Sequence, residues 1–133
     1  MKKLLMLLTL FVAFVASAQT ESAESYKAYC EIVGTGNITG TKVKIEADLG
    51  QKRITDTWGG DAARKIVDEN GKEIQFNSMM DAVNHFAQLG WVLEFTYAVY
   101  SDKGMSGQTV YHYVLSKTVS SDEEVRKGLN FKK

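Results

Sequence analysis

Two long alternating segments in the second half of the chain constrain its fold more than any other feature. In residues 91–100 and 109–117, large apolar side chains recur at every second position, as in β-strands with one face in a core. The eight residues between the segments are polar and include two glycines, so an antiparallel hairpin is the simplest connection. We therefore expect a hairpin whose aromatic face, with Tyr97, Tyr111 and Tyr113, packs on a helix.

The apolar sides of the two segments also predict how the hairpin pairs. Directly opposed residues share a face, so the register has to match the two apolar sets. The predicted opposing pairs are Tyr97 with Tyr111, Phe95 with Tyr113, and Leu93 with Leu115. The other face would be mixed and only partly covered, with Val92, Glu94, Thr96, Val110, His112 and Val114.

One main helix is predicted over residues 79–89. Ser78 is a suitable N-cap, and Asp81 three residues later can complete a capping box. Apolar residues recur on one side of the segment at helical spacing. Gly90 is well placed to end the helix in the left-handed conformation.

Two further hairpins are predicted before this helix. Residues 26–33 and 42–49 form the N-terminal one, because the second segment alternates strictly between charged and apolar side chains and glycines separate the two. A short central hairpin is predicted from residues 64–68 and 73–76, since Asn70-Gly71 favours a tight turn. The expected fold is α+β, with a small antiparallel sheet packed on one main helix.

The expected domain, residues 26–117, is flanked by less regular segments. Residues 19–25 are polar and predict a flexible lead-in, and residues 50–63 predict a loop. In the tail, residues 118–133, Ser121 and Glu124 form a second capping-box pattern ahead of Gly128. A helix this short has to pack through apolar neighbours to persist. The available neighbours are Val125, Leu129 and Phe131.

The first 18 residues predict a secretory signal peptide. Lys2 and Lys3 precede an uncharged apolar run over residues 4–16, and Ala16 and Ala18 supply the small residues of a cleavage site. The run is shorter than the about 20 apolar residues that a membrane-spanning helix needs. We therefore expect cleavage near Ala18 and a secreted or periplasmic protein without a membrane span.

Charge and cysteine content exclude some classes of function. The 133 residues carry 16 basic and 16 acidic side chains; without Lys2 and Lys3, 14 basic residues face 16 acidic ones, a net charge of −2. A nucleic-acid binder usually has a basic excess, so this class is disfavoured. Cys30 is the single cysteine, so no disulfide can form within the chain. It is either a thiol buried on a strand or one that reacts or pairs between chains.

Five short motifs follow one another within about residues 65–117: Asp68-Glu69-Asn70-Gly71-Lys72, Phe76-Asn77-Ser78, Asp81-Ala82-Val83-Asn84, Leu89-Gly90-Trp91 and Tyr111-His112-Tyr113-Val114-Leu115-Ser116-Lys117. This succession of helix, Gly-Trp and hairpin is similar to the family named domain of unknown function 4177, and the chain resembles small secreted bacterial proteins of unknown function. The resemblance covers less than half of the mature chain. It implies an α+β fold and no catalytic residues.

No reactive set of side chains is apparent in the sequence. His85 and His112 lack the spacing of paired metal ligands, and no serine lies in a G-x-S-x-G elbow. We therefore predict no catalytic residue, cofactor or metal. One enzymatic alternative stays open, a hydrolytic or metal-dependent enzyme that uses His112 with Glu94 on one sheet face.

The remaining candidates are side chains that could contact a ligand or partner. Trp58 lies in a glycine-flanked loop, and Tyr100 ends a strand. The full set of contact candidates is Trp58, Tyr100, His112, Glu94 and Met105. The leading hypothesis is an exported binding domain without catalytic activity, whose partner is an envelope or extracellular protein or a small ligand. The alternative is an inhibitor or structural accessory protein of the cell envelope. Open sheet edges also allow a homo-oligomer.

Overall fold

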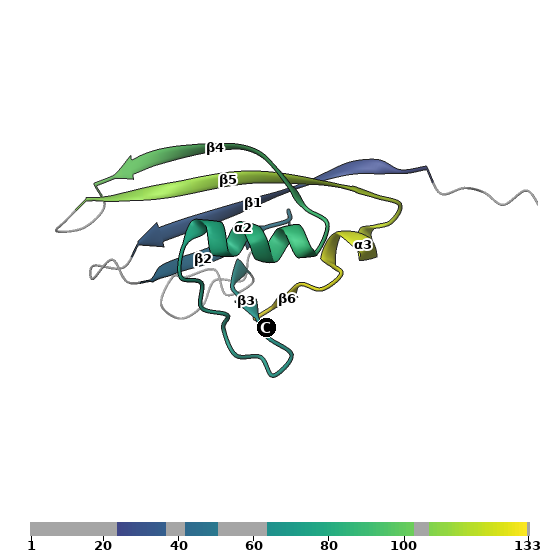
Figure 1. Ribbon diagram of the computed structural model, residues 1–133, viewed down its shortest axis with the longest axis horizontal. Helices are drawn as coiled ribbons and strands as arrows, with labels where there is room; N and C mark the ends of the chain where they lie inside the picture. Colours follow the sequence, from purple (N-terminus) through teal and green to yellow (C-terminus); the bar gives the residue numbers. More distant parts are fainter. Residues whose placement is uncertain (1–23, 37–41, 51–63, 103–106, 133) are drawn as a thin grey trace, which may run out of the picture.

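The computed structural model describes residues 24–36, 42–50, 64–102 and 107–132, which form a mainly antiparallel sheet with one main helix (Figure 1). The α+β class predicted from the sequence is therefore confirmed. The expected signal peptide, most of the lead-in and the loop over residues 51–63 lie outside the described residues. Among those that are described, no helix is long and apolar enough to cross a membrane.

The main sheet has four strands in the order β2–β1–β5–β4, and every neighbouring pair is antiparallel (Figure 1). The strands are β1 (Tyr26–Gly36), β2 (Val43–Asp48), β4 (Val92–Ser101) and β5 (Gln108–Val119). β1 and β5 pair along most of their length at the centre. This long-range pairing joins the N-terminal hairpin to the aromatic one.

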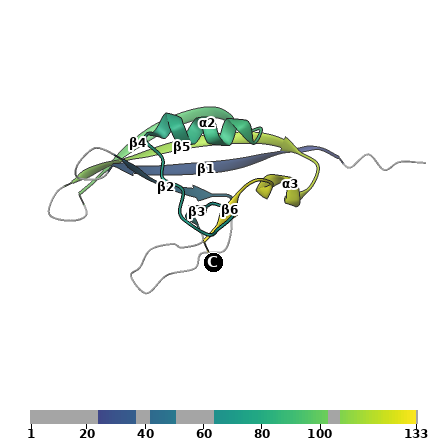
Figure 2. The ribbon, with the colours of Figure 1, turned by 60° about the horizontal axis from the view of Figure 1, so that its bottom comes forward.

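The main helix, α2 (Met79–Gln88), covers one face of the sheet (Figure 2). The Ser78 hydroxyl accepts a hydrogen bond from the Asp81 amide at 3.1 Å, and the Asp81 carboxylate accepts one from the Asn77 amide at 2.9 Å. Gly90 follows with a φ of +89°. The helix, its N-cap and its glycine stop thus lie where the sequence predicted them.

Loss of this cap gives a first prediction. Ser78→Ala should lower the free energy of unfolding by about 1 kcal/mol, because a helix amide loses its partner. Urea unfolding measures the change. Ser121→Ala is the matched control, since Ser121 is also an N-cap but makes no side-chain capping bond. Equal losses in the two variants would contradict the role of Ser78.

The core lies between α2 and the face of the sheet that we call the inner face. Phe86 and Trp91 meet edge to face there, with ring centroids 6.5 Å apart. Gly34 on β1 leaves room for Met79, whose sulfur would lie only 2.0 Å from a Cβ at that position. The buried members of the core cluster are Cys30, Ile32, Ile45, Ala47, Ile66, Phe76, Met79, Ala82, Val83, Phe86, Trp91, Leu115 and Leu129.

The central segment forms less regular structure than predicted. Its first strand, β3 (Ile66–Val67), pairs with β6 (Asn130–Phe131) in a separate two-stranded sheet. The predicted return strand makes no regular ladder: Glu73 bridges Val67, with a backbone hydrogen bond from Ile74 to Ile66 at 3.0 Å, and Phe76 bridges Val43. In the turn, Gly71 has a positive φ and Asn70 does not. Asp68 accepts hydrogen bonds from the amides of Asn70 and Lys72.

The tail contains the predicted short helix, α3 (Asp122–Arg126). Leu129 is buried, and Val125 and Phe131 pack against the core, which is the packing that a helix this short needs to persist. The predicted capping box is wrong in one respect. Glu124 accepts a hydrogen bond from the Ser120 amide at 2.9 Å, but the Ser121 side chain makes no capping bond.

A β-bulge in β4 corrects the predicted register of the aromatic hairpin. Leu93 lies opposite Leu115 as predicted, but the register then shifts between Leu93 and Phe95. The predicted pairs Phe95–Tyr113 and Tyr97–Tyr111 are wrong: Phe95 lies opposite Val114, and Tyr97 lies opposite His112. A bulge adds one residue to one strand, and a shift of one residue moves each following side chain to the other face.

This shift overturns the expectation that the whole aromatic face packs on the helix. Phe95, Tyr97 and Val99 lie on the face away from α2, which we call the outer face, and are 57%, 44% and 47% exposed. Tyr113 is partly buried against the core, whereas Tyr111 stays exposed on the inner face. Only part of the predicted aromatic set therefore serves the core.

Candidate functional site

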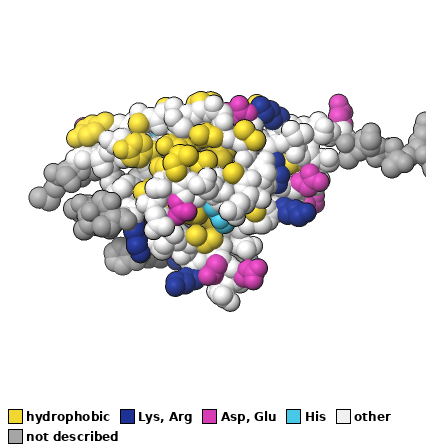
Figure 3. All heavy atoms as spheres, viewed as in Figure 1, with side chains coloured by type: hydrophobic (Ala, Val, Ile, Leu, Met, Phe, Trp, Pro, Cys, Tyr) yellow, Lys and Arg dark blue, Asp and Glu magenta, His cyan; other side chains and the backbone are white. Residues whose placement is uncertain are grey.

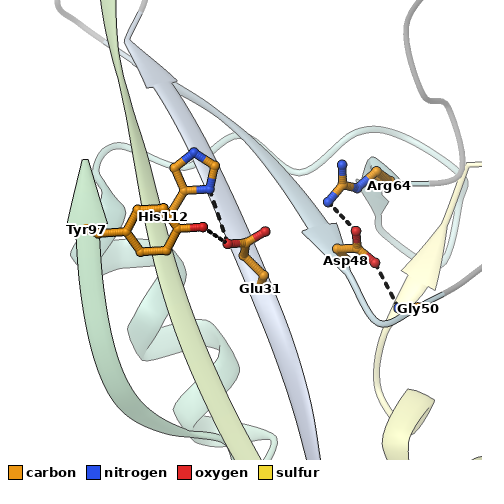
Figure 4. Close-up of polar contacts among 6 residues, drawn as sticks. All are labelled: Glu31, Asp48, Gly50, Arg64, Tyr97 and His112. Atoms are coloured by element: carbon orange, nitrogen blue, oxygen red, sulfur yellow. Dashed lines mark hydrogen bonds and ion pairs between the residues drawn. The ribbon is translucent and has the colours of Figure 1, made fainter. Parts of the chain in front are cut away.

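The outer face of the main sheet gathers apolar, aromatic and polar side chains from three strands. Figure 4 views the sheet from this side, with α2 behind it. The alternation of β1, β5 and the part of β4 after the bulge places these residues. They are Tyr29, Glu31, Val33, Phe95, Tyr97, Val99, Val110, His112 and Val114, together with Val92, which precedes the bulge and lies opposite Ser116.

Three of these residues form a polar cluster at the centre of the face (Figure 4). The Tyr97 hydroxyl donates a hydrogen bond to Glu31 Oε1 at 2.6 Å, and His112 Nδ1 lies 3.2 Å from the same oxygen. The rings of Tyr97 and His112 stack with centroids 4.5 Å apart and planes 7° apart. Phe95 extends the stack, 6.4 Å from the Tyr97 ring.

The electrostatics of this cluster follow from the position of Glu31. Its hydrogen bond with Tyr97 raises the pKa of the Tyr97 phenol above its ordinary value of 10.0, because a phenolate beside a carboxylate is disfavoured. The His112 and Glu31 side chains are only 20% and 29% exposed. Their contact is an ion pair when the imidazole is protonated.

Chemically, the cluster brings a carboxylate, a phenol and an imidazole together at one oxygen. Glu31 Oε1 already takes both contacts, and no serine, cysteine or lysine belongs to the cluster. Within the described part of the chain, no group of three or more potential metal ligands comes together.

Glu94 lies at the bulge and serves a different set of contacts. It forms an ion pair with Lys27 at 2.6 Å and accepts a hydrogen bond from the Ser116 hydroxyl. These two partners lower the pKa of the Glu94 carboxyl. The structure therefore pairs Glu94 with Lys27 and His112 with Glu31, and does not bring His112 and Glu94 together as the enzymatic alternative requires.

The other candidate contact residues are not part of this cluster. Tyr100 is 70% exposed near the end of β4, and its pairing with Thr109 places it on the inner face. Trp58 and Met105 lie outside the described residues.

A hollow on the helix side of the molecule offers a second, weaker candidate. It has a volume of about 220 Å³ and lies between α2 and residues 74–76. Ligand pockets typically measure about 300–1,000 Å³ and are mainly apolar. This hollow is smaller and largely polar, with Ile74, Gln75, Phe76, Asp81, Asn84, His85 and Gln88 as its lining.

Two members of the cluster, Glu31 and Tyr97, are not among the contact candidates predicted from the sequence. Tyr97 was expected in the core, because nothing in the alternating pattern marks the bulge. Glu31 carried a usable signal, since it is a charged residue between the apolar Cys30 and Ile32. That signal could indicate an outward position but not its neighbours.

No family model matches the chain, and comparisons with curated proteins and with solved structures find no match either.

Proposed function

We propose that this protein is an exported domain that binds another protein on the outer face of its sheet and catalyses no reaction. The observation that carries the proposal is the set of half-exposed apolar side chains on that face. Folded monomers rarely leave large contiguous apolar patches uncovered, and such patches mark interaction sites. The side chains concerned are Tyr29, Val92, Phe95, Tyr97 and Val99.

A protein fits this surface better than a small ligand does. Small ligands bind mainly in concave pockets that enclose most of their surface. The outer face presents side chains from neighbouring strands of one sheet, and the described hollow lies on the helix side. An exposed sheet face that carries apolar side chains is a surface that a protein partner can cover.

The polar groups on the face support the same interpretation. Protein interfaces combine an apolar centre with a polar rim, and a few oriented polar groups provide specificity. Glu31, Tyr97 and His112 supply such groups at the centre. The Lys27–Glu94 and Lys44–Glu46 ion pairs lie toward its sides.

Export is part of the proposal and is supported by residues 1–18 of the sequence. The test is the mass of the protein recovered from the periplasm or medium of an expression host. We expect a chain that starts at Gln19. A protein that stays in the cytoplasm with its first residues attached would contradict export. That result would not bear on the proposed binding surface.

Binding is tested by a charge placed on the outer face. Phe95→Glu should weaken capture of the envelope partner at least about tenfold, because a carboxylate would replace an apolar contact. Met80→Glu is the matched control, since Met80 is equally exposed but lies on α2. Quantitative pull-down with the exported protein compares the two variants with the wild type.

The comparison of Phe95→Glu with Met80→Glu tests whether binding occurs through the outer face. Equal loss, or no loss, in both would contradict binding through the outer face. Addition of the purified protein to an assay of the captured partner then separates two roles. A fall in partner activity identifies an inhibitor, and unchanged activity identifies an accessory protein.

A further inference from the structure

The two edges of the main sheet differ in how far other described segments of the chain cover them. Beside β2, bridges from Phe76 to Val43 and from Lys65 to Glu46 occupy the edge. An ion pair of 2.6 Å between Arg64 and Asp48 adds to this cover. Along β4, no strand or bridge from the described residues occupies the free edge. One edge is therefore protected within the chain, and the other is left open.

The open edge also lacks the usual protection against pairing with another chain. Edge strands are commonly short or carry lysine, proline or inward-pointing charges. β4 is ten residues long, and residues 95–101 contain no charge and no proline. Its one bulge and one charge, at Glu94, lie near the start of the strand.

Apolar side chains are exposed on both faces of β4, and this distribution indicates which kind of element could cover the edge. Val92, Phe95 and Val99 are exposed on the outer face, and Leu93 and Tyr100 on the inner face. Figure 3 shows hydrophobic side chains gathered above α2, over β4 and β5 on the inner side. A helix laid on one face would cover only half of these side chains. A strand added at the edge would flank both sets at once.

We propose that a second copy of this chain pairs with β4 edge to edge, giving an antiparallel dimer with one continuous eight-stranded sheet. The two-fold axis would stand perpendicular to the sheet, so both α2 helices would lie on one side and both outer faces on the other. This inference goes beyond the proposed function, because it needs no other protein.

The sequence of β4 is compatible with pairing to itself. With the two-fold axis at Tyr97, each Phe95 lies opposite Val99 of the other copy on the outer face. Thr96 lies opposite Ala98 on the inner face. Aromatic residues opposite β-branched ones are favourable cross-strand pairs, and no like charges meet. Pairing would also satisfy the free backbone amides and carbonyls of both edges.

The exposed side chains of β4 present more than half of the area that a stable dimer interface buries. Six exposed side chains of β4 present on the order of 500 Å² per copy, given the size of aromatic side chains. A stable interface buries roughly 800 Å² per partner. The backbone edge of β4 adds to this area, because its free amides and carbonyls leave solvent when a strand pairs with them.

The test is the mass of the exported wild-type protein in solution, measured alone by sedimentation equilibrium. We expect twice the mass of one chain. Ala98→Lys and Thr96→Lys should each weaken the dimer at least about a hundredfold, because each puts two positive charges beside the two-fold axis. Gln108→Lys is the matched control, an exposed strand position one strand in from the edge, and should leave the dimer intact.

Each outcome supports or overturns the inference. A wild-type protein that stays monomeric at its highest soluble concentration overturns it, as does a dimer that survives both edge variants. Circular dichroism confirms that the variants keep their fold. Ala98 and Thr96 alternate with the outer-face residues, so both substitutions leave the outer face unchanged. Loss of dimer with partner capture retained would therefore separate this inference from the proposed function.

Discussion

Phe86→Ala should lower the free energy of unfolding by about 3–5 kcal/mol, the range for removal of a buried aromatic ring. Phe86 is fully buried in the last turn of α2, and its ring meets Trp91 edge to face. Truncation would leave a cavity between the helix and the inner face, which the packed strands cannot fill. Small domains are stable by about 5–15 kcal/mol in total, so one ring carries a large share.

Chemical unfolding of the wild type and the variant measures this loss. Met80→Ala is the matched control, because Met80 lies on the same helix and is half-exposed. Its effect should stay within about 0.5 kcal/mol. Comparable losses in the two variants would mean that α2 does not cover the core as described.

The buried thiol of Cys30 should make the protein less stable in alkali. Burial raises its pKa from 9.0 to about 12, and the nearby charges of Asp48 and Glu31 act in the same direction. Between these two pH values, the unfolded chain releases a proton that the native chain keeps. The unfolded state then binds fewer protons, so stability falls as the pH rises, by about 1.4 kcal/mol per pH unit.

A comparison with Cys30→Ala isolates this effect from other groups that titrate in alkali. At neutral pH the variant should be less stable than the wild type, because it leaves a small cavity. As the pH rises from 9 to 12, the difference should shrink and reverse, by about 4 kcal/mol in all. A pH-independent difference, or rapid alkylation of the native thiol at pH 9, would contradict burial of Cys30.

Local patterns were sufficient to predict α2 and the class of the fold. The Ser78 cap, the apolar spacing within the helix and the Gly90 stop all act within a few residues of one another. Strand positions were also predictable, because alternation reflects the pleat of a single strand. These features depend on neighbours in sequence, which one sequence contains in full.

The bulge near Glu94 shows where local patterns stop being informative. Residues 91–99 alternate without interruption, so they predict a strand with a single apolar face. In the structure, Leu93 lies opposite Leu115 on the inner face, while Phe95 and Tyr97 turn to the outer face. A bulge adds one unpaired residue that the alternating pattern does not reveal, yet it decides which aromatic side chains reach the surface.

The sequence by itself determined the helix with its cap and stop, the positions of the main strands and the single cysteine on a strand. Only the tertiary structure decided the strand order, the register after Glu94 and the cluster on the outer face. Glu31 precedes Tyr97 by 66 residues and His112 by 81, and they meet because β1 and β4 both pair with β5. Pairing between strands depends on packing of the whole core, which no local pattern contains.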